Sequence, residues 1–369
     1  MVPTNAMNMK LRGYGEKGAG MLKGFRQIAT VVSLCSAVAL LYACGGGGGG
    51  GGGGTPSTSS LGVYSGKTTQ ATITEASTKE TLAGMNDIIP SCTATGVAKT
   101  ATDEQLKTVM SVVKSVKLLL PPPPAKIAGK TVALISSTPP ATQTGSCGGT
   151  LSYPTYSHAS GTTTVSVKLD NYCTVDSSSG NRTTMNGTVN AVDAGTPTAT
   201  GPVTTSLTAN IPLLTVVEKT AAGAAVSSDT IAMSGFKYVP TAGATTDIDN
   251  LPGTMTLTTV EVKSVEGATT KEFKANNVSV TTTKVGTNSQ VAFTGTICRG
   301  TSGCSAVKTD TPLVTDSNQN FQSGAISFTG TGGSKATLTV VPGFGQTFNV
   351  SFNGTPLTGT QLQCDGIGL

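Results

Sequence analysis

The chain has 369 residues, a formal net charge of +5, a hydrophobic content of 37% and an aromatic content of 4%, with no tryptophan. Most of the excess positive charge lies before residue 27, so the basic character gives no support to a nucleic-acid partner. The single histidine, His158, excludes a multi-histidine metal site and restricts any Ser-His-Asp triad to that one residue.

The N-terminus has the organisation of an export signal. Basic residues from Lys10 to Arg26 precede an uncharged, mostly apolar run at residues 28–43. This run is shorter than the roughly 20 apolar residues that a membrane-spanning helix needs. Met21 begins a signal of ordinary proportions, so Met21 is a candidate start of translation beside Met1.

The apolar run ends in a tetrapeptide that resembles the lipobox of bacterial lipoproteins: Leu41, Tyr42, Ala43 and Cys44. The resemblance implies that residues 1–43 are a signal peptide and that the cysteine receives the lipid. Tyr42 departs from the small residue usual at that position. Because Gly45 and not aspartate follows the cysteine, the resemblance also points to the outer membrane, on its periplasmic face or at the cell surface.

Residues 44–60 are expected to be a flexible tether. They contain ten consecutive glycines, Gly45 to Gly54, followed by a Thr/Pro/Ser segment. Polyglycine has maximal backbone freedom, and the sixteen residues between Gly45 and Ser60 would have a root-mean-square span of roughly 20–25 Å.

Residues 61–124 form a partly helical segment in this interpretation. A capping box at 77–80 predicts a short helix through about residue 88, with Ser77 as its N-cap. A second helix is predicted over 102–117, where apolar residues recur at three- and four-residue spacing. Four prolines at 121–124 end it with a stiff spacer.

Residues 125–369 are predicted to be an all-β domain. Thr, Val, Ile and Phe dominate between turn-forming clusters, which is typical of an antiparallel meander of about ten to twelve strands. A sheet of that size must curl, close or split, so a sandwich, a half-barrel and a closed barrel are all expected alternatives. The expected strands are 150–156, 163–175, 183–193, 203–218, 227–239, 253–265, 271–284, 289–298, 303–310, 321–330, 334–341 and 346–352.

Six cysteines remain after those of the signal and the lipid site are set aside, and an even number in an oxidising compartment indicates disulfides. Cys147 and Cys173 are equidistant from a turn near residue 160, and Cys298 and Cys304 bracket a Gly-containing loop. These positions predict the pairs 147–173 and 298–304, which leave Cys92 to pair with Cys364. Zinc is disfavoured because only one pair is closely spaced.

Candidate chemistry is sparse. His158 is expected in a solvated turn, and no catalytic residue and no cofactor is predicted. Two short acidic stretches are weak calcium candidates that read more simply as turns, at Asp247 and Asp249 and at Asp316, Asn318 and Asn320. Paired carboxylates for glycoside hydrolysis depend on the fold and stay open.

Three functions are weighed. The first is a non-catalytic structural or interaction domain, held on the membrane by its lipid, that meets an envelope protein, a polysaccharide or another copy. The second is a carrier of lipid or another apolar ligand in a curled sheet that the helices at 77–120 cap, and this reading needs an apolar cavity. The third is a carbohydrate-active hydrolase that uses carboxylates.

Overall fold

The computed structural model describes residues 60–78, 92–94, 141–176, 179–198, 201–241, 253–316, 321–342 and 347–364. The signal peptide, the lipobox with Cys44, the tether before Ser60, the helix at 102–117 and the proline run lie outside the described residues. Expectations about those segments stay predictions.

The described chain is almost entirely strand. The strands are β1 (Cys92–Ala94), β2 (Gln143–Thr144), β3 (Thr150–Ala159), β4 (Thr162–Val175), β5 (Arg182–Thr198), β6 (Gly201–Lys219), β7 (Ala225–Pro240), β8 (Gly253–Glu266), β9 (Thr269–Val285), β10 (Asn288–Arg299), β11 (Gly303–Thr315), β12 (Phe321–Thr329), β13 (Lys335–Val340), β14 (Thr347–Phe352) and β15 (Thr355–Cys364), with a 3₁₀ helix, η2 (Thr331–Gly333), before β13.

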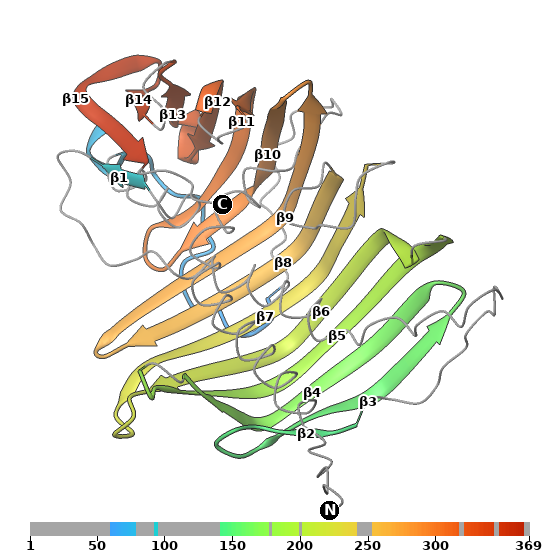
Figure 1. Cartoon of the computed structure of the whole chain (residues 1–369). Coiled ribbons are helices and arrows are strands. Elements are labelled where there is room, and N and C mark those ends of the chain that lie inside the picture. The colour runs from blue at the N-terminus through green and yellow to red at the C-terminus, as the bar shows by residue number, and fades with distance from the viewer. Residues whose placement is uncertain are drawn as a thin grey trace, which may run out of the picture.

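These strands form one sheet (Figure 1). From β2 to β15 each strand pairs antiparallel with the next, and β1 adds to the far side of β15, so β1 and β2 are the two edges. The sheet is open, and the expected antiparallel meander is confirmed in its half-barrel form. The twelve expected strands correspond in order to β3–β14, whereas β1, β2 and β15 were not predicted.

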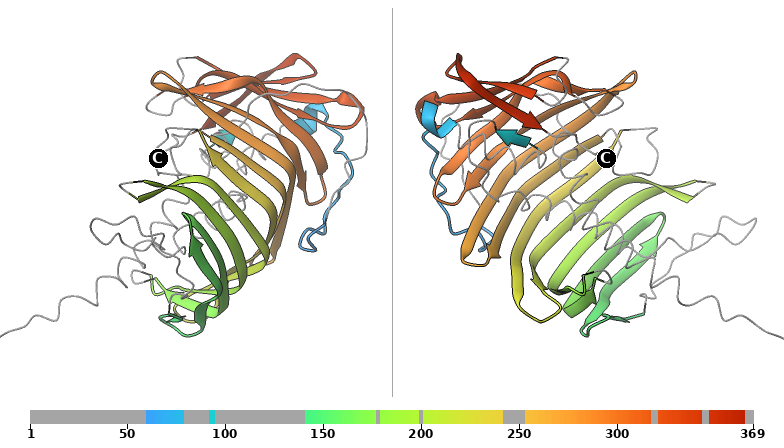
Figure 2. Two further views of the ribbon diagram at one scale, coloured as in Figure 1. Left: turned by 90° about the vertical axis from the view of Figure 1, so that its right-hand side faces the viewer. Right: turned by 60° about the vertical axis from the view of Figure 1, so that its left-hand side comes forward.

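A line of irregularities crosses the middle of the sheet. Buried apolar side chains mostly take every second residue, but in five strands they make one step of three: Leu169 to Tyr172, Ile211 to Leu214, Met233 to Phe236, Leu257 to Val260 and Ala275 to Val278. Asn171, Gly235 and Asn277 lie within these steps and have φ angles of 48°, 66° and 49°. Bulges bend a strand, and bulges aligned on neighbouring strands curve the sheet into the trough of Figure 2.

The two faces of the trough differ. The apolar residues of the alternation form one core cluster on the concave face, including Val260, Val262 and Phe273. The convex face carries the alternate residues, mainly Thr, Ser, Asn and Lys. Residues 60–74, which we call the strap, lie along the convex side (Figure 2) until Ile73 joins the core cluster at the end of the β12–β13 hairpin.

The predicted helix start at Ser77 is wrong. A helical turn covers residues 75–78, and Thr74 is its N-cap. The Ser77 amide donates to Thr74 Oγ1 (3.0 Å), and the Thr74 amide donates to Ser77 Oγ (2.7 Å), so the reciprocal cap forms three residues earlier than expected. No helix within the described ranges is long and apolar enough to cross a membrane.

Candidate functional site

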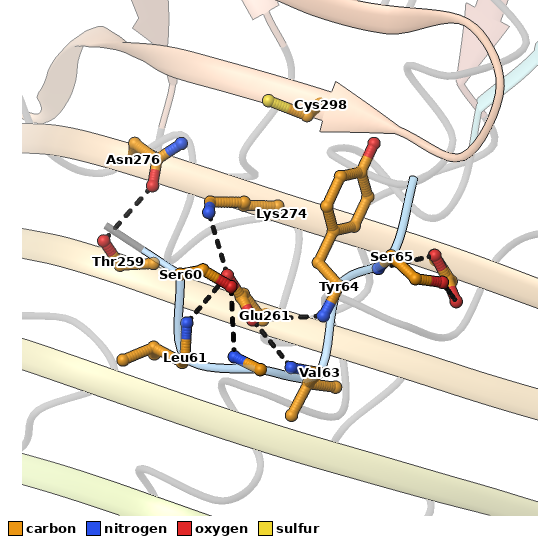
Figure 3. Close-up of polar contacts among 12 residues, drawn as sticks. Ser60, Leu61, Val63, Tyr64, Ser65, Thr259, Glu261, Lys274, Asn276 and Cys298 are labelled. Carbon is orange, nitrogen blue, oxygen red and sulfur yellow. Dashed lines mark hydrogen bonds and ion pairs between the residues drawn. The ribbon is translucent and has the colours of Figure 1, made fainter. Parts of the chain in front are cut away.

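The most constrained polar cluster of the described chain lies where the strap crosses β8 and β9 (Figure 3). Glu261 Oε1 accepts the amide of Leu61 (3.1 Å), and Oε2 accepts those of Val63 (2.9 Å) and Tyr64 (3.0 Å). Lys274 Nζ lies 2.8 Å from Glu261 Oε1, and the two side chains are 1% and 0% exposed. A fully buried ion pair therefore clamps the strap to the sheet.

The partners of Glu261 and of its neighbour Glu272 favour the ionised form of both carboxylates. Burial by itself raises the pKa of Glu261, but the Lys274 ammonium and the three strap amides outweigh it and leave the pKa below its ordinary value. Beside it, Glu272 accepts the Ser65 amide (3.0 Å) and hydroxyl (2.7 Å). The pKa of Glu272 is also lowered, because these bonds and Lys263 outweigh burial.

Tyr64 anchors the strap beyond the ion pair. Its ring packs with Cys298 and Cys304, and its hydroxyl donates to a strap carbonyl 2.9 Å away. Burial first, and then the charges of Glu272 and Glu261, raise the pKa of Tyr64 to about 12, so the phenol is neutral.

The strap then bonds to two hairpin ends by its backbone. The Cys304 amide donates to the Thr69 carbonyl (2.8 Å), and the Ala71 amide donates to the Cys304 carbonyl (2.7 Å). The Thr331 amide donates to the Ala71 carbonyl (2.7 Å). The strap thus joins β8 to β12 across the convex side.

A row of small polar side chains crosses the convex face near the bulges. Pairing sets Thr155 opposite Ser166, Ser166 opposite Asn190, and Asn190 opposite Asn210; we call these four residues the open row. They line a groove of about 150 Å³, which also includes Thr164 and Thr208. Hydroxyls and amides in this arrangement can donate to and accept from a polar partner.

The row continues towards the strap contact on β8 and β9. Asn210 Oδ1 accepts the Gly235 amide (2.8 Å), Ser234 pairs with Thr259, and Thr259 pairs with Asn276. We call Thr259 and Asn276 the covered row, because they are only 1% and 4% exposed. The Thr259 hydroxyl donates to Asn276 Oδ1 at 3.2 Å.

His158 is not in a solvated turn, which corrects the expectation. Its side chain is 8% exposed, and its Nδ1 is hydrogen-bonded to Thr163 Oγ1 at 2.8 Å. Strand β3 continues to Ala159, beyond the predicted end, so His158 falls on the buried side of the alternation. The turn itself lies at Ser160 and Gly161, as expected.

A group of carboxylates lies at one end of β6–β8. Asp229 pairs with Ser264 and is partly buried, and burial is the main cause that raises its pKa. The nearby charges of Glu218 and Glu266 raise it further, while the Ser264 hydroxyl lowers it. Within the part of the chain that the structure describes, no set of three His, Cys, Asp or Glu residues could hold a metal ion.

Of the calcium candidates, only Asp316 is described, and it accepts a hydrogen bond from Gln322 Nε2 (2.9 Å). Asn318, Asn320, Asp247 and Asp249 lie outside the described residues. A cavity of about 220 Å³ lies between the end of the strap and β10–β12, where Ile73, Ile297 and Phe328 meet Ser77, Ser305 and Arg299. Its lining mixes apolar and polar groups.

Two disulfides are confirmed: Cys147–Cys173, at the start of the first long hairpin, and Cys298–Cys304, across the β10–β11 hairpin. The pairing of β1 with β15 sets the backbone of Cys92 opposite that of Cys364. The third disulfide stays a prediction that this register supports.

No family model, curated protein or solved structure matches this chain. The interpretation of the site therefore depends on its geometry alone. Sequence reasoning missed Glu261 and Lys274, and the only local signal is their place between buried apolar neighbours in the alternation.

Proposed function

We propose that the mature chain is a bacterial envelope lipoprotein, anchored through Cys44 to the outer membrane, whose sheet is a non-catalytic structural or interaction domain. The observation that carries the proposal is the open row with its polar groove, on a sheet whose strap is clamped directly downstream of the tether. An envelope protein or a polysaccharide presents the donors and acceptors that such a row can meet. The two disulfides support an oxidising compartment.

The anchor is tested by expressing the full chain in a bacterial host with labelled palmitate, beside a Cys44→Ala variant. The proposal expects label and outer-membrane fractionation for the wild type only. Unlabelled wild-type protein in the cytosol would contradict it. The interaction role is tested by crosslinking in the host envelope, with a Ser166→Ala/Asn190→Ala variant expected to lose crosslinks that the wild type forms.

A second candidate is a carrier of an apolar ligand, because the concave face is one continuous apolar cluster. Its described side chains are buried, so a ligand would need them to become exposed. Native mass spectrometry of protein purified from its host membrane separates the candidates. A co-purifying lipid selects the carrier, and a protein companion selects the interaction domain.

A further inference from the structure

The groove on the open row is lined by polar side chains whose hydrogen-bonding groups the protein does not use. Thr155, Thr164, Ser166, Asn190 and Thr208 line it, and their side chains form no hydrogen bond with any residue that the structure describes. Thr155 is exposed, and the other four are half-buried. In the covered row, by contrast, the side chains bond to each other. The groove therefore keeps donors and acceptors for a ligand.

Strand pairing arranges the lining in two parallel rows that cross the sheet. The open row places one residue on each of β3–β6. A second row lies two residues away along the strands and contains Thr164 in β4, Val192 in β5 and Thr208 in β6. Neighbouring strands are about 4.8 Å apart, and alternate residues of one strand are about 6.6 Å apart. The groove is therefore a short channel across the strands, and its side chains repeat at the strand spacing.

An extended β-linked glycan chain matches this channel. Each sugar lengthens such a chain by about one pyranose ring, which is close to the strand spacing of about 4.8 Å, so consecutive sugars meet consecutive strands. Sugar hydroxyls both donate and accept, as do the hydroxyls and the amide of the lining. The groove of about 150 Å³ is smaller than the roughly 300 Å³ of a drug-sized pocket, so it suits one ring of a longer chain.

The lining favours a glycan over a protein. Centres of protein interfaces are enriched in aromatic, Met and Arg side chains that act as anchors, and the groove lining contains none of these. Of its apolar members, Val165 and Ala191 are only 1% and 3% exposed. The lining is also uncharged, because Lys168, two residues beyond Ser166 in β4, lies outside it. An uncharged glycan therefore fits better than an acidic one.

We infer that the groove on the open row binds an extended, uncharged glycan chain that runs across β3–β6. This inference deepens the proposed interaction role and rests on it, because it names the partner of the same row. The groove offers hydrogen bonds and no aromatic ring for stacking, so a single chain should bind weakly.

The test titrates the mature chain carrying Cys44→Ala with tetrasaccharides and follows binding by saturation-transfer NMR. The probes are cellotetraose and chitotetraose, which are uncharged, and tetragalacturonate, which is acidic. We expect saturation transfer to the uncharged probes, unchanged by added salt. Ser166→Ala/Asn190→Ala removes two hydrogen-bonding groups and should weaken binding about tenfold or more. The control, Thr337→Ala/Ser351→Ala, alters a half-buried cross-strand pair of β13 and β14 outside the groove and should change binding by less than about twofold.

No transfer to either uncharged probe, or equal losses in the two double variants, would overturn the inference. Tighter, salt-sensitive binding of tetragalacturonate would also overturn it, because recognition would then depend on the surrounding lysines. The crosslinking experiment on the same Ser166→Ala/Asn190→Ala variant detects protein companions. If that variant loses protein crosslinks while no tetrasaccharide binds the wild type, the interaction role stands and the glycan inference fails.

Discussion

The covered and open halves of the convex row carry the same kinds of side chain in different surroundings. Thr259 and Asn276 are buried beside the Glu261–Lys274 pair, whereas Thr155 and Asn210 are exposed to solvent. The covered pair is next to the buried carboxylate of Glu261, which holds the strap amides. Small polar residues on this sheet therefore either lie near the protein's own N-terminal segment or remain exposed and available to a partner.

Breaking the clamp should have the largest effect. Glu261→Gln leaves the Lys274 ammonium buried without its counter-charge, and we expect a loss of about 3–5 kcal/mol in the free energy of unfolding. Chemical denaturation measures it. The matched control is Glu272→Gln, in the same strap contact but at a more exposed pair, with an expected loss of about 1 kcal/mol. Equal losses would contradict a special role for Glu261.

The two disulfides should contribute unequally to the free energy of unfolding. Cys147–Cys173 lies beside the open half and spans 26 residues, whereas Cys298–Cys304 lies under Tyr64 and spans 6. On loop entropy alone, replacement by serine should cost about 3–4 kcal/mol for the first pair and about 2 kcal/mol for the second. A larger loss for 298–304 would show that its packing under the strap dominates.

Thiol counting on unreduced protein tests the third pair, with no free thiol expected from Cys92 or Cys364.

Gly235 lies at the boundary between the two halves. Its φ is +66°, and an added Cβ would collide with the Thr258 side chain, so Gly235→Ala should cost about 2–3 kcal/mol. Gly267→Ala is the control, because Gly267 has a φ of +58° but open space around it, and about 1 kcal/mol is expected. Thermal or chemical unfolding gives both values. Equal losses would mean that only backbone strain matters at the bulge.

Matched asparagines compare the halves directly. Asn276→Ala removes one hydrogen-bond partner of the buried Thr259 hydroxyl and should cost about 1 kcal/mol. Asn190→Ala in the open row should change stability by less than about 0.5 kcal/mol. If Asn190→Ala proved as destabilising as Asn276→Ala, the open row would be part of the structural frame and not a free surface.

Changing the pH near neutrality should have the smallest effect on the free energy of unfolding. The folded-state pKa of Glu261 lies below its unfolded value, so the clamp's contribution is fully present above the ordinary glutamate pKa of about 4.3 and is lost as pH falls through the folded value. The stability difference between wild type and Glu261→Gln should therefore be constant from pH 7 to about 5 and shrink below about 4. A difference independent of pH would contradict the ionised clamp.

The long strands could be predicted because local chemistry specifies them. Alternation such as Thr164 to Lys168, bounded by turn residues, identifies a half-buried strand without reference to its neighbours. The steps of three, as from Leu257 to Val260, are visible in the sequence and predict bulges, although only their alignment across strands shows that they bend the sheet. Strand β15 was missed because its Gln- and Thr-rich sequence has weak alternation.

The clamp could not be predicted, because it joins residues far apart in the chain. Glu261 and Leu61 are 200 positions apart, and in a strand a glutamate between Val260 and Val262 reads as an exposed residue on the polar face. His158 shows the same limit. The predicted strand ended at residue 156, before this histidine, so its side chain was expected in solvent although it is buried. Burial of a polar side chain depends on which distant segment covers it.

The most direct test of the clamped strap is hydrogen–deuterium exchange at the amides of Leu61, Val63 and Tyr64 in the mature protein. If Glu261 holds them, they should be protected as strongly as the β8 amides in the wild type. In Glu261→Gln they should exchange like an unstructured chain while β8 stays protected. Exchange in the wild type at the rate of a free tail would contradict the clamp.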